Sequence, residues 1–85
     1  MKMQNEYYKT SDICLAAFLL AKEIEFAGIN KDSTNRATFL FSPTKNCLSL
    51  VSDFSQMKTT VEPMGFHAAM KRLKQLLYLN KNEHE

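Results

Sequence analysis

The chain has 85 residues, of which 45% are hydrophobic and 24% charged, and its formal net charge is +2. This length supports one domain, because two domains of half the size would each be too small for a core. The ordinary apolar fraction and the low net charge exclude a chain that is mainly disordered. The longest apolar run, residues 13–21, is much shorter than the about 20 residues that span a bilayer as a helix. The first residues also match a signal peptide poorly, so we expect a cytoplasmic protein.

The first predicted element is a helix that follows a polar lead-in over residues 1–9. Thr10 or Ser11 is a suitable N-cap, and Asp12 then lies in the first turn, where the helix dipole favours a carboxylate. The helix is expected to run to about Lys22. Its apolar residues cover nearly all sides, which predicts a helix that is buried on more than one face.

A hairpin is predicted next, because residues 23–30 and 36–42 both alternate between apolar and polar side chains. Residues 31–35 are polar and form the expected turn. Gly28 interrupts the alternation of the first strand and predicts a bulge or a strand end.

Two further helices and one strand complete the predicted fold. Ser42 and Pro43 predict a helix start, with apolar residues at helical spacing to about Asp53. Residues 57–61 are rich in β-forming residues and predict a third strand. Pro63 opens the last helix, whose apolar residues form an amphipathic stripe: Phe66, Met70, Leu73 and Leu77.

These elements predict a small α+β domain over residues 10–79, with residues 80–85 as a polar tail. The expected order is α-β-β-α-β-α, with helices packed on a three-stranded antiparallel sheet. The sheet edges and the apolar first helix leave room for association with a second copy of the chain.

Catalytic and metal-binding patterns are weak in this sequence. Glu23 and Glu25 alternate on one strand face and are expected to be solvated, and His67 has no partner that would orient it. The two glycines exclude a Gly-rich phosphate loop. We therefore expect no enzyme, no cofactor, no metal site and no small-molecule substrate.

The cysteines and the strand aromatics are expected to belong to the core. Cys14 and Cys47 lie far apart on predicted apolar helix faces, which favours reduced core thiols over a zinc site or a disulfide. Phe26, Phe39 and Phe41 lack the interleaved basic residues of a base-stacking platform, so core packing is favoured for them as well.

All of the excess positive charge lies in the last predicted helix. Residues 1–62 contain seven basic and seven acidic residues, whereas residues 63–81 contain four basic residues and no acid. Two interpretations are open: the cations stabilise the negative end of the helix, or they contact phosphates or an acidic protein surface. The candidate contact residues are Lys71, Arg72, Lys74 and Lys81.

The chain resembles a family of short uncharacterised domains found in bacteria, archaea and their viruses. The resemblance covers about residues 7–78 and implies a viral or mobile-element setting, without catalytic residues to transfer. In this family an Asp usually precedes the helix-opening Pro, where this chain has Glu62. The residues that carry it are Tyr8-Lys9-Thr10-Ser11-Asp12, Leu15-Ala16-Ala17-Phe18-Leu19-Leu20-Ala21-Lys22, Phe39-Leu40-Phe41, Val61-Glu62-Pro63 with Phe66, Leu73-Lys74 and Leu77-Tyr78.

Two functions are therefore expected, in order of preference. The first is a small accessory or regulatory protein that binds another protein, with a homodimer as one form of this and the host cytoplasm as its location if the protein is viral. The second is nucleic-acid binding through the basic last helix, which predicts salt-dependent affinity. No membrane association is expected.

Overall fold

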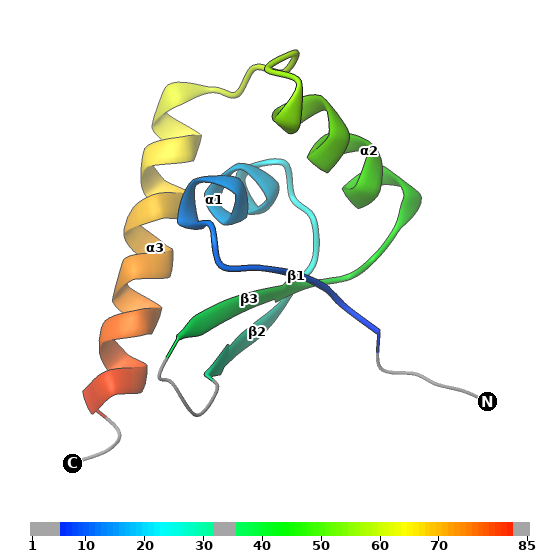
Figure 1. Ribbon diagram of the computed structural model, residues 1–85. Helices are drawn as coiled ribbons and strands as arrows, with labels where there is room; N and C mark the ends of the chain where they lie inside the picture. Colours follow the sequence, from blue (N-terminus) through cyan, green and yellow to red (C-terminus); the bar gives the residue numbers. More distant parts are fainter. Residues whose placement is uncertain (1–5, 32–35, 83–85) are drawn as a thin grey trace.

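The computed structural model describes residues 6–31 and 36–82. Over these residues the predicted fold class is confirmed, because three helices pack on a three-stranded antiparallel sheet (Figure 1). No helix within the described ranges is long and apolar enough to cross a membrane. The elements in chain order are β1 (Tyr8–Thr10), α1 (Ile13–Ala21), β2 (Phe26–Lys31), β3 (Ala37–Phe41), α2 (Lys45–Ser55) and α3 (Pro63–Asn82).

The sheet has the order β1-β3-β2, with both outer strands antiparallel to β3. The predicted hairpin is confirmed as β2 and β3, and the register shifts between Phe26 and Gly28, as the broken alternation indicated. Gly28 has a φ of 141°, a region that favours glycine. Of the predicted turn, Lys31 belongs to β2 and residues 32–35 lie outside the described part of the chain.

The predicted position of the third strand is wrong. Residues 57–61 form no strand, and β1 at Tyr8–Thr10 pairs with β3 instead, so the order of elements is β-α-β-β-α-α. Met57 has a φ of 59°, which is outside the range of an extended strand. Tyr8 and Lys9, which were assigned to the polar lead-in, lie opposite Phe41 and Leu40.

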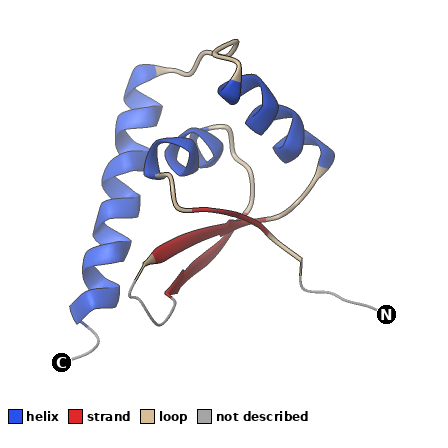
Figure 2. Ribbon diagram, in the orientation of Figure 1, coloured by secondary structure: helices blue, strands red, loops and turns tan. Residues whose placement is uncertain are grey.

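Helix α1 is the centre of the fold and is buried on more than one face, as its apolar composition predicted. It connects β1 to β2 and lies between α2 and α3, with all three helices on one side of the sheet (Figure 2). Five consecutive residues of α1 are buried, and they form one core with residues of β3, α2 and α3. The core consists of Leu15, Ala16, Ala17, Phe18, Leu19, Ile24, Phe39, Phe41, Cys47, Ala69 and Leu73.

The helix starts follow capping chemistry at positions that differ slightly from the prediction. Asp12 is itself the N-cap of α1, because its Oδ1 accepts hydrogen bonds from the amides of Cys14 at 2.9 Å and Leu15 at 3.4 Å. The N-cap of α2 is Thr44 rather than Ser42. The side chains of Asp and Thr are short. Their oxygens reach the amide of the second or third helical residue only from the residue that directly precedes the helix.

Helices α1 and α2 both end in a left-handed residue that is not glycine. Glu23 has a φ of 67° and Met57 a φ of 59°. In α1 the amides of Glu23 and Ile24 donate to the carbonyls of Leu20 and Leu19, each at 3.0 Å, which is the Schellman pattern. The left-handed backbone conformation destabilises a residue with a Cβ by roughly 1 kcal/mol, and glycine does not have this penalty.

We therefore predict that Glu23→Gly and Met57→Gly each raise the free energy of unfolding by about 0.5–1 kcal/mol, because glycine removes the strain of this conformation. Thermal unfolding should shift upward by about 4 °C for a domain of this size. The matched control is Ser49→Gly in the exposed face of α2, where glycine should destabilise the helix by about 0.5 kcal/mol. Destabilisation by Glu23→Gly and Met57→Gly would contradict the left-handed assignment.

Candidate binding surface

The residues examined as candidates for catalysis do not form a site together. Glu23, Glu25 and His67 are all exposed, and the Glu25 carboxylate accepts a hydrogen bond from the Ser42 hydroxyl at 3.1 Å. Among the described residues, no group of three or more His, Cys, Asp or Glu side chains is arranged to hold a metal ion. These side chains therefore lie at separate places on the surface.

The two cysteines differ in environment, which corrects the prediction that both belong to the core. Cys47 is fully buried in α2, whereas Cys14 is exposed in the first turn of α1, and both thiols are free. Burial raises the pKa of the Cys47 thiol, which keeps it protonated and unreactive at neutral pH. The pKa of the Tyr8 phenol is raised chiefly by burial, and further by electrostatic repulsion from the Cys47 thiolate, which forms only at high pH, and from the Asp12 carboxylate.

The inner face of α3 closes the core and confirms the predicted apolar stripe. Leu73 is fully buried, and Phe66, Met70 and Leu77 pack against the core. At the start of the helix, the Glu62 carboxylate accepts a hydrogen bond from the Gly65 amide at 2.6 Å, and Pro63 is the first helical residue. With the helix start at Pro63 and the buried stripe on one side, the helical period determines which residues of α3 face outward.

The outward residues of α3 form a surface of cationic and apolar side chains, which we call the α3 outer face. Its members recur at spacings of three and four, so they share one side of the helix. Among the described residues, no hydrogen bond or ion pair engages the side chains of Lys71, Arg72 or Lys74. The α3 outer face consists of Met64, His67, Lys71, Arg72, Lys74, Gln75, Tyr78 and Leu79.

The length of α3 separates the four predicted contact residues into two groups. The helix ends at Asn82, so Lys74 lies more than two turns before its end, about 12 Å along the axis. The helix dipole stabilises cations only within the last turn. The dipole therefore accounts for Lys81, whose side chain is outside the described part of the structure, and leaves Lys71, Arg72 and Lys74 without a role in the helix itself.

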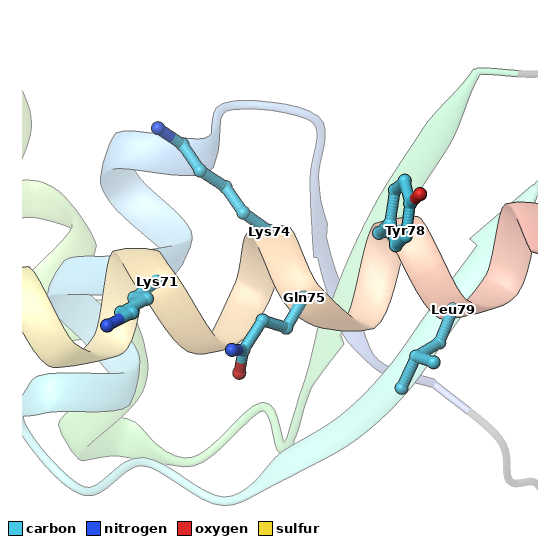
Figure 3. Close-up of a pocket in the computed structure, with 5 residues that line it drawn as sticks. All are labelled: Lys71, Lys74, Gln75, Tyr78 and Leu79. Carbon is cyan, nitrogen blue, oxygen red and sulfur yellow. The ribbon is translucent and has the colours of Figure 1, made fainter.

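Two neighbouring hollows lie beside α3, one on the α3 outer face and one between that face and the inner face, and Lys71 and Lys74 border both. The first has a volume of about 480 Å³ and is shown in Figure 3. The second has a volume of about 410 Å³ and lies toward the start of the helix. The described residues that line the first are Lys71, Lys74, Gln75, Tyr78 and Leu79, and those that line the second are Phe66, His67, Met70, Lys71 and Lys74.

The apolar part of this surface was not predicted from the sequence. Met64, Tyr78 and Leu79 are 73%, 66% and 59% exposed, and they make up half of the large hydrophobic residues that are exposed in the described chain. The signal was available, because Tyr78 follows Lys71 by seven residues and Lys74 by four, on the side opposite Leu73. Charge by itself indicates only the lysines and the arginine of this surface.

Comparison with known proteins places the chain in a family. Residues 5–79 match the model of a domain of unknown function, DUF5659. No curated protein and no solved structure matches the chain. Because the match covers most of the 85 residues, from before β1 nearly to the end of α3, the protein belongs to the DUF5659 family.

Proposed function

We propose that the protein is a non-enzymatic accessory or regulatory protein that binds another protein through the α3 outer face. The observation that carries this proposal is the combination of exposed Met64, Tyr78 and Leu79 with cations that have no described intramolecular partner. Exposed apolar side chains that gather on one face are typical of an interface. Tyr, Met and Arg are also enriched in protein interfaces relative to the rest of the surface.

The same composition favours a protein over a nucleic acid as the partner. Binding to a duplex or single strand relies mainly on phosphate contacts, and its affinity grows with the number of cations that reach the backbone. The α3 outer face provides three described cations, Lys71, Arg72 and Lys74, and the whole chain has a net charge of only +2. Apolar side chains at both ends of this short basic segment suit a partner that has its own apolar residues.

Charge also argues against a second copy bound through the same face. In a symmetric dimer, the same patch meets itself on both subunits. Lys71, Arg72 and Lys74 would then face their own copies, and the α3 segment from Pro63 to Asn82 contains no acid that could compensate. A partner with carboxylates on its surface is complementary instead.

A photocrosslinking experiment tests this proposal. The amino acid p-benzoylphenylalanine is placed at Gln75, in the middle of the α3 outer face, and at Ser49, an exposed position on α2 that serves as the matched control. After irradiation in cells that naturally produce the protein, we expect an adduct at position 75 whose size nuclease treatment does not change. We expect this adduct to be absent at position 49.

Two results would contradict the proposal. Equal adducts at both positions would mean that α3 is not the preferred surface. An adduct at position 75 that nuclease removes would identify the protein as a nucleic-acid-binding protein. The slope of log affinity against log salt is then negative, and Lys71→Gln with Lys74→Gln should make it less steep by about two.

A further inference from the structure

The order of chemical groups along α3 specifies what kind of partner segment fits it. Half-buried Phe66 and Met70 line the hollow toward the start of the helix, and exposed Tyr78 and Leu79 line the hollow toward its end. Lys71 and Lys74 belong to both hollows and therefore lie between them. From the flank of α3 that borders the core to its outer face, the helix thus presents an apolar region, a pair of ammonium groups and a second apolar region.

We infer that the α3 outer face binds an acidic segment of a partner protein in which apolar side chains flank carboxylates on both sides. This inference rests on the proposed function and deepens it. The carboxylates pair with the Lys71 and Lys74 ammonium groups, and the flanking apolar side chains enter the two hollows. Charge complementarity selects this occupant, since neither a basic segment nor a second α3 pairs with the two lysines.

The geometry also sets the spacing of the flanking apolar residues. The residues that belong to only one hollow are centred about 14 Å apart along the helix axis. The hollows are also offset around α3, since Phe66 and Met70 lie on the flank that borders the core. A helical partner segment that reaches both therefore crosses α3 obliquely and needs at least about nine or ten residues, close to three turns. The carboxylates then lie in the middle turn, opposite Lys71 and Lys74.

Fluorescence anisotropy with designed peptides tests this inference. The probe is a fluorescein-labelled, alanine-rich helical peptide with Leu and Phe three turns apart and Glu residues in the turn between them. One control peptide has the same composition with the Glu residues outside and the apolar residues together, and a second has Gln in place of Glu. We expect both controls to bind at least about tenfold more weakly than the probe.

Variants of the protein test the contributions of the two lysines and of the apolar residues separately. Lys71→Gln with Lys74→Gln should remove the preference for Glu over Gln, whereas Tyr78→Ala with Leu79→Ala should remove the preference for the apolar–acidic–apolar order. Lys45→Gln, an exposed lysine on α2, is the matched control and should leave both preferences unchanged. All of these positions are exposed, so the fold should be retained.

The outcomes separate this inference from the proposed function. If the rearranged peptide binds as well as the probe, or if no peptide binds, the inferred order is wrong, while a protein adduct at position 75 would still support protein binding. If the probe binds but no such adduct forms in cells, the proposed function fails. If an unlabelled single-stranded oligonucleotide displaces the labelled probe at lower concentration than unlabelled probe peptide does, the partner class is wrong.

Discussion

Replacing Phe18 with alanine is expected to lower the free energy of unfolding by about 3–5 kcal/mol. Phe18 is 1% exposed in the middle of α1, and its ring centroid lies 5.2 Å from that of Phe54 in α2. The Lys22 ammonium lies 5.8 Å from the same ring centroid. Truncation leaves a cavity at the junction of the helices and removes the aromatic pair, and α1 cannot shift to fill the space without disturbing the sheet.

This loss is large relative to the stability that the domain can have. A domain of 85 residues is typically stable by about 4–13 kcal/mol, so the variant should lose about a quarter or more of its stability at 25 °C. Urea denaturation followed by circular dichroism measures the effect. The matched control is Leu79→Ala, which truncates a side chain that is 59% exposed and should cost less than about 0.5 kcal/mol. A cost below about 1 kcal/mol for Phe18→Ala would contradict the central position of α1.

The second large effect is expected on binding and not on stability. The combined variant Lys71→Glu, Arg72→Glu and Lys74→Glu reverses the charge of the α3 outer face and should weaken binding to the crosslinked partner by about a hundredfold or more at physiological salt. Lys, Arg and Glu have similar helix propensities. Positions 71 and 74 carry like charges before and after the change, so the repulsion between them stays about the same. The thermal unfolding midpoint should therefore change little.

Isothermal titration and thermal unfolding of the same samples separate these effects. A matched control reverses the charge of Lys45 and Lys58, which are exposed in α2 and after it, and should leave the affinity within about twofold. Equal affinity of the wild-type protein and the triple variant would show that the cations of α3 do not contribute to recognition.

Local patterns predicted the elements whose conformation is decided by nearby residues. The apolar α1, the hairpin of β2 and β3, and the start of α3 at Pro63 all follow from periodicity and from capping or turn residues. Residues 57–61 have β-forming side chains, but Met57 ends α2 in a left-handed conformation, without the glycine that normally marks such an end. β1 has only three residues, and it forms because β3 is available to pair with it, which is a long-range contact that a local pattern does not contain.

The cations of the candidate surface could be predicted from the sequence, whereas its exposed apolar residues and the length of its helix could not. The sequence identified Lys71, Arg72 and Lys74 because α3 contains no acid, and periodicity placed His67 with the two lysines. It did not show that the helix continues to Asn82, which removes the helix dipole as an explanation for these cations. The exposure of Tyr78 and Leu79 depends on how far α3 extends beyond the part that α1 covers, which is a property of tertiary packing.

The α3 outer face as the binding surface is tested most directly by titrating isotope-labelled protein with the crosslinked partner and following backbone amide shifts by NMR. We predict that the largest shift changes fall on α3, at His67, Lys71, Gln75 and Tyr78, with the sheet unchanged. Shift changes concentrated on Lys9, Thr38 and Leu40 of the sheet, with α3 unaffected, would contradict the account.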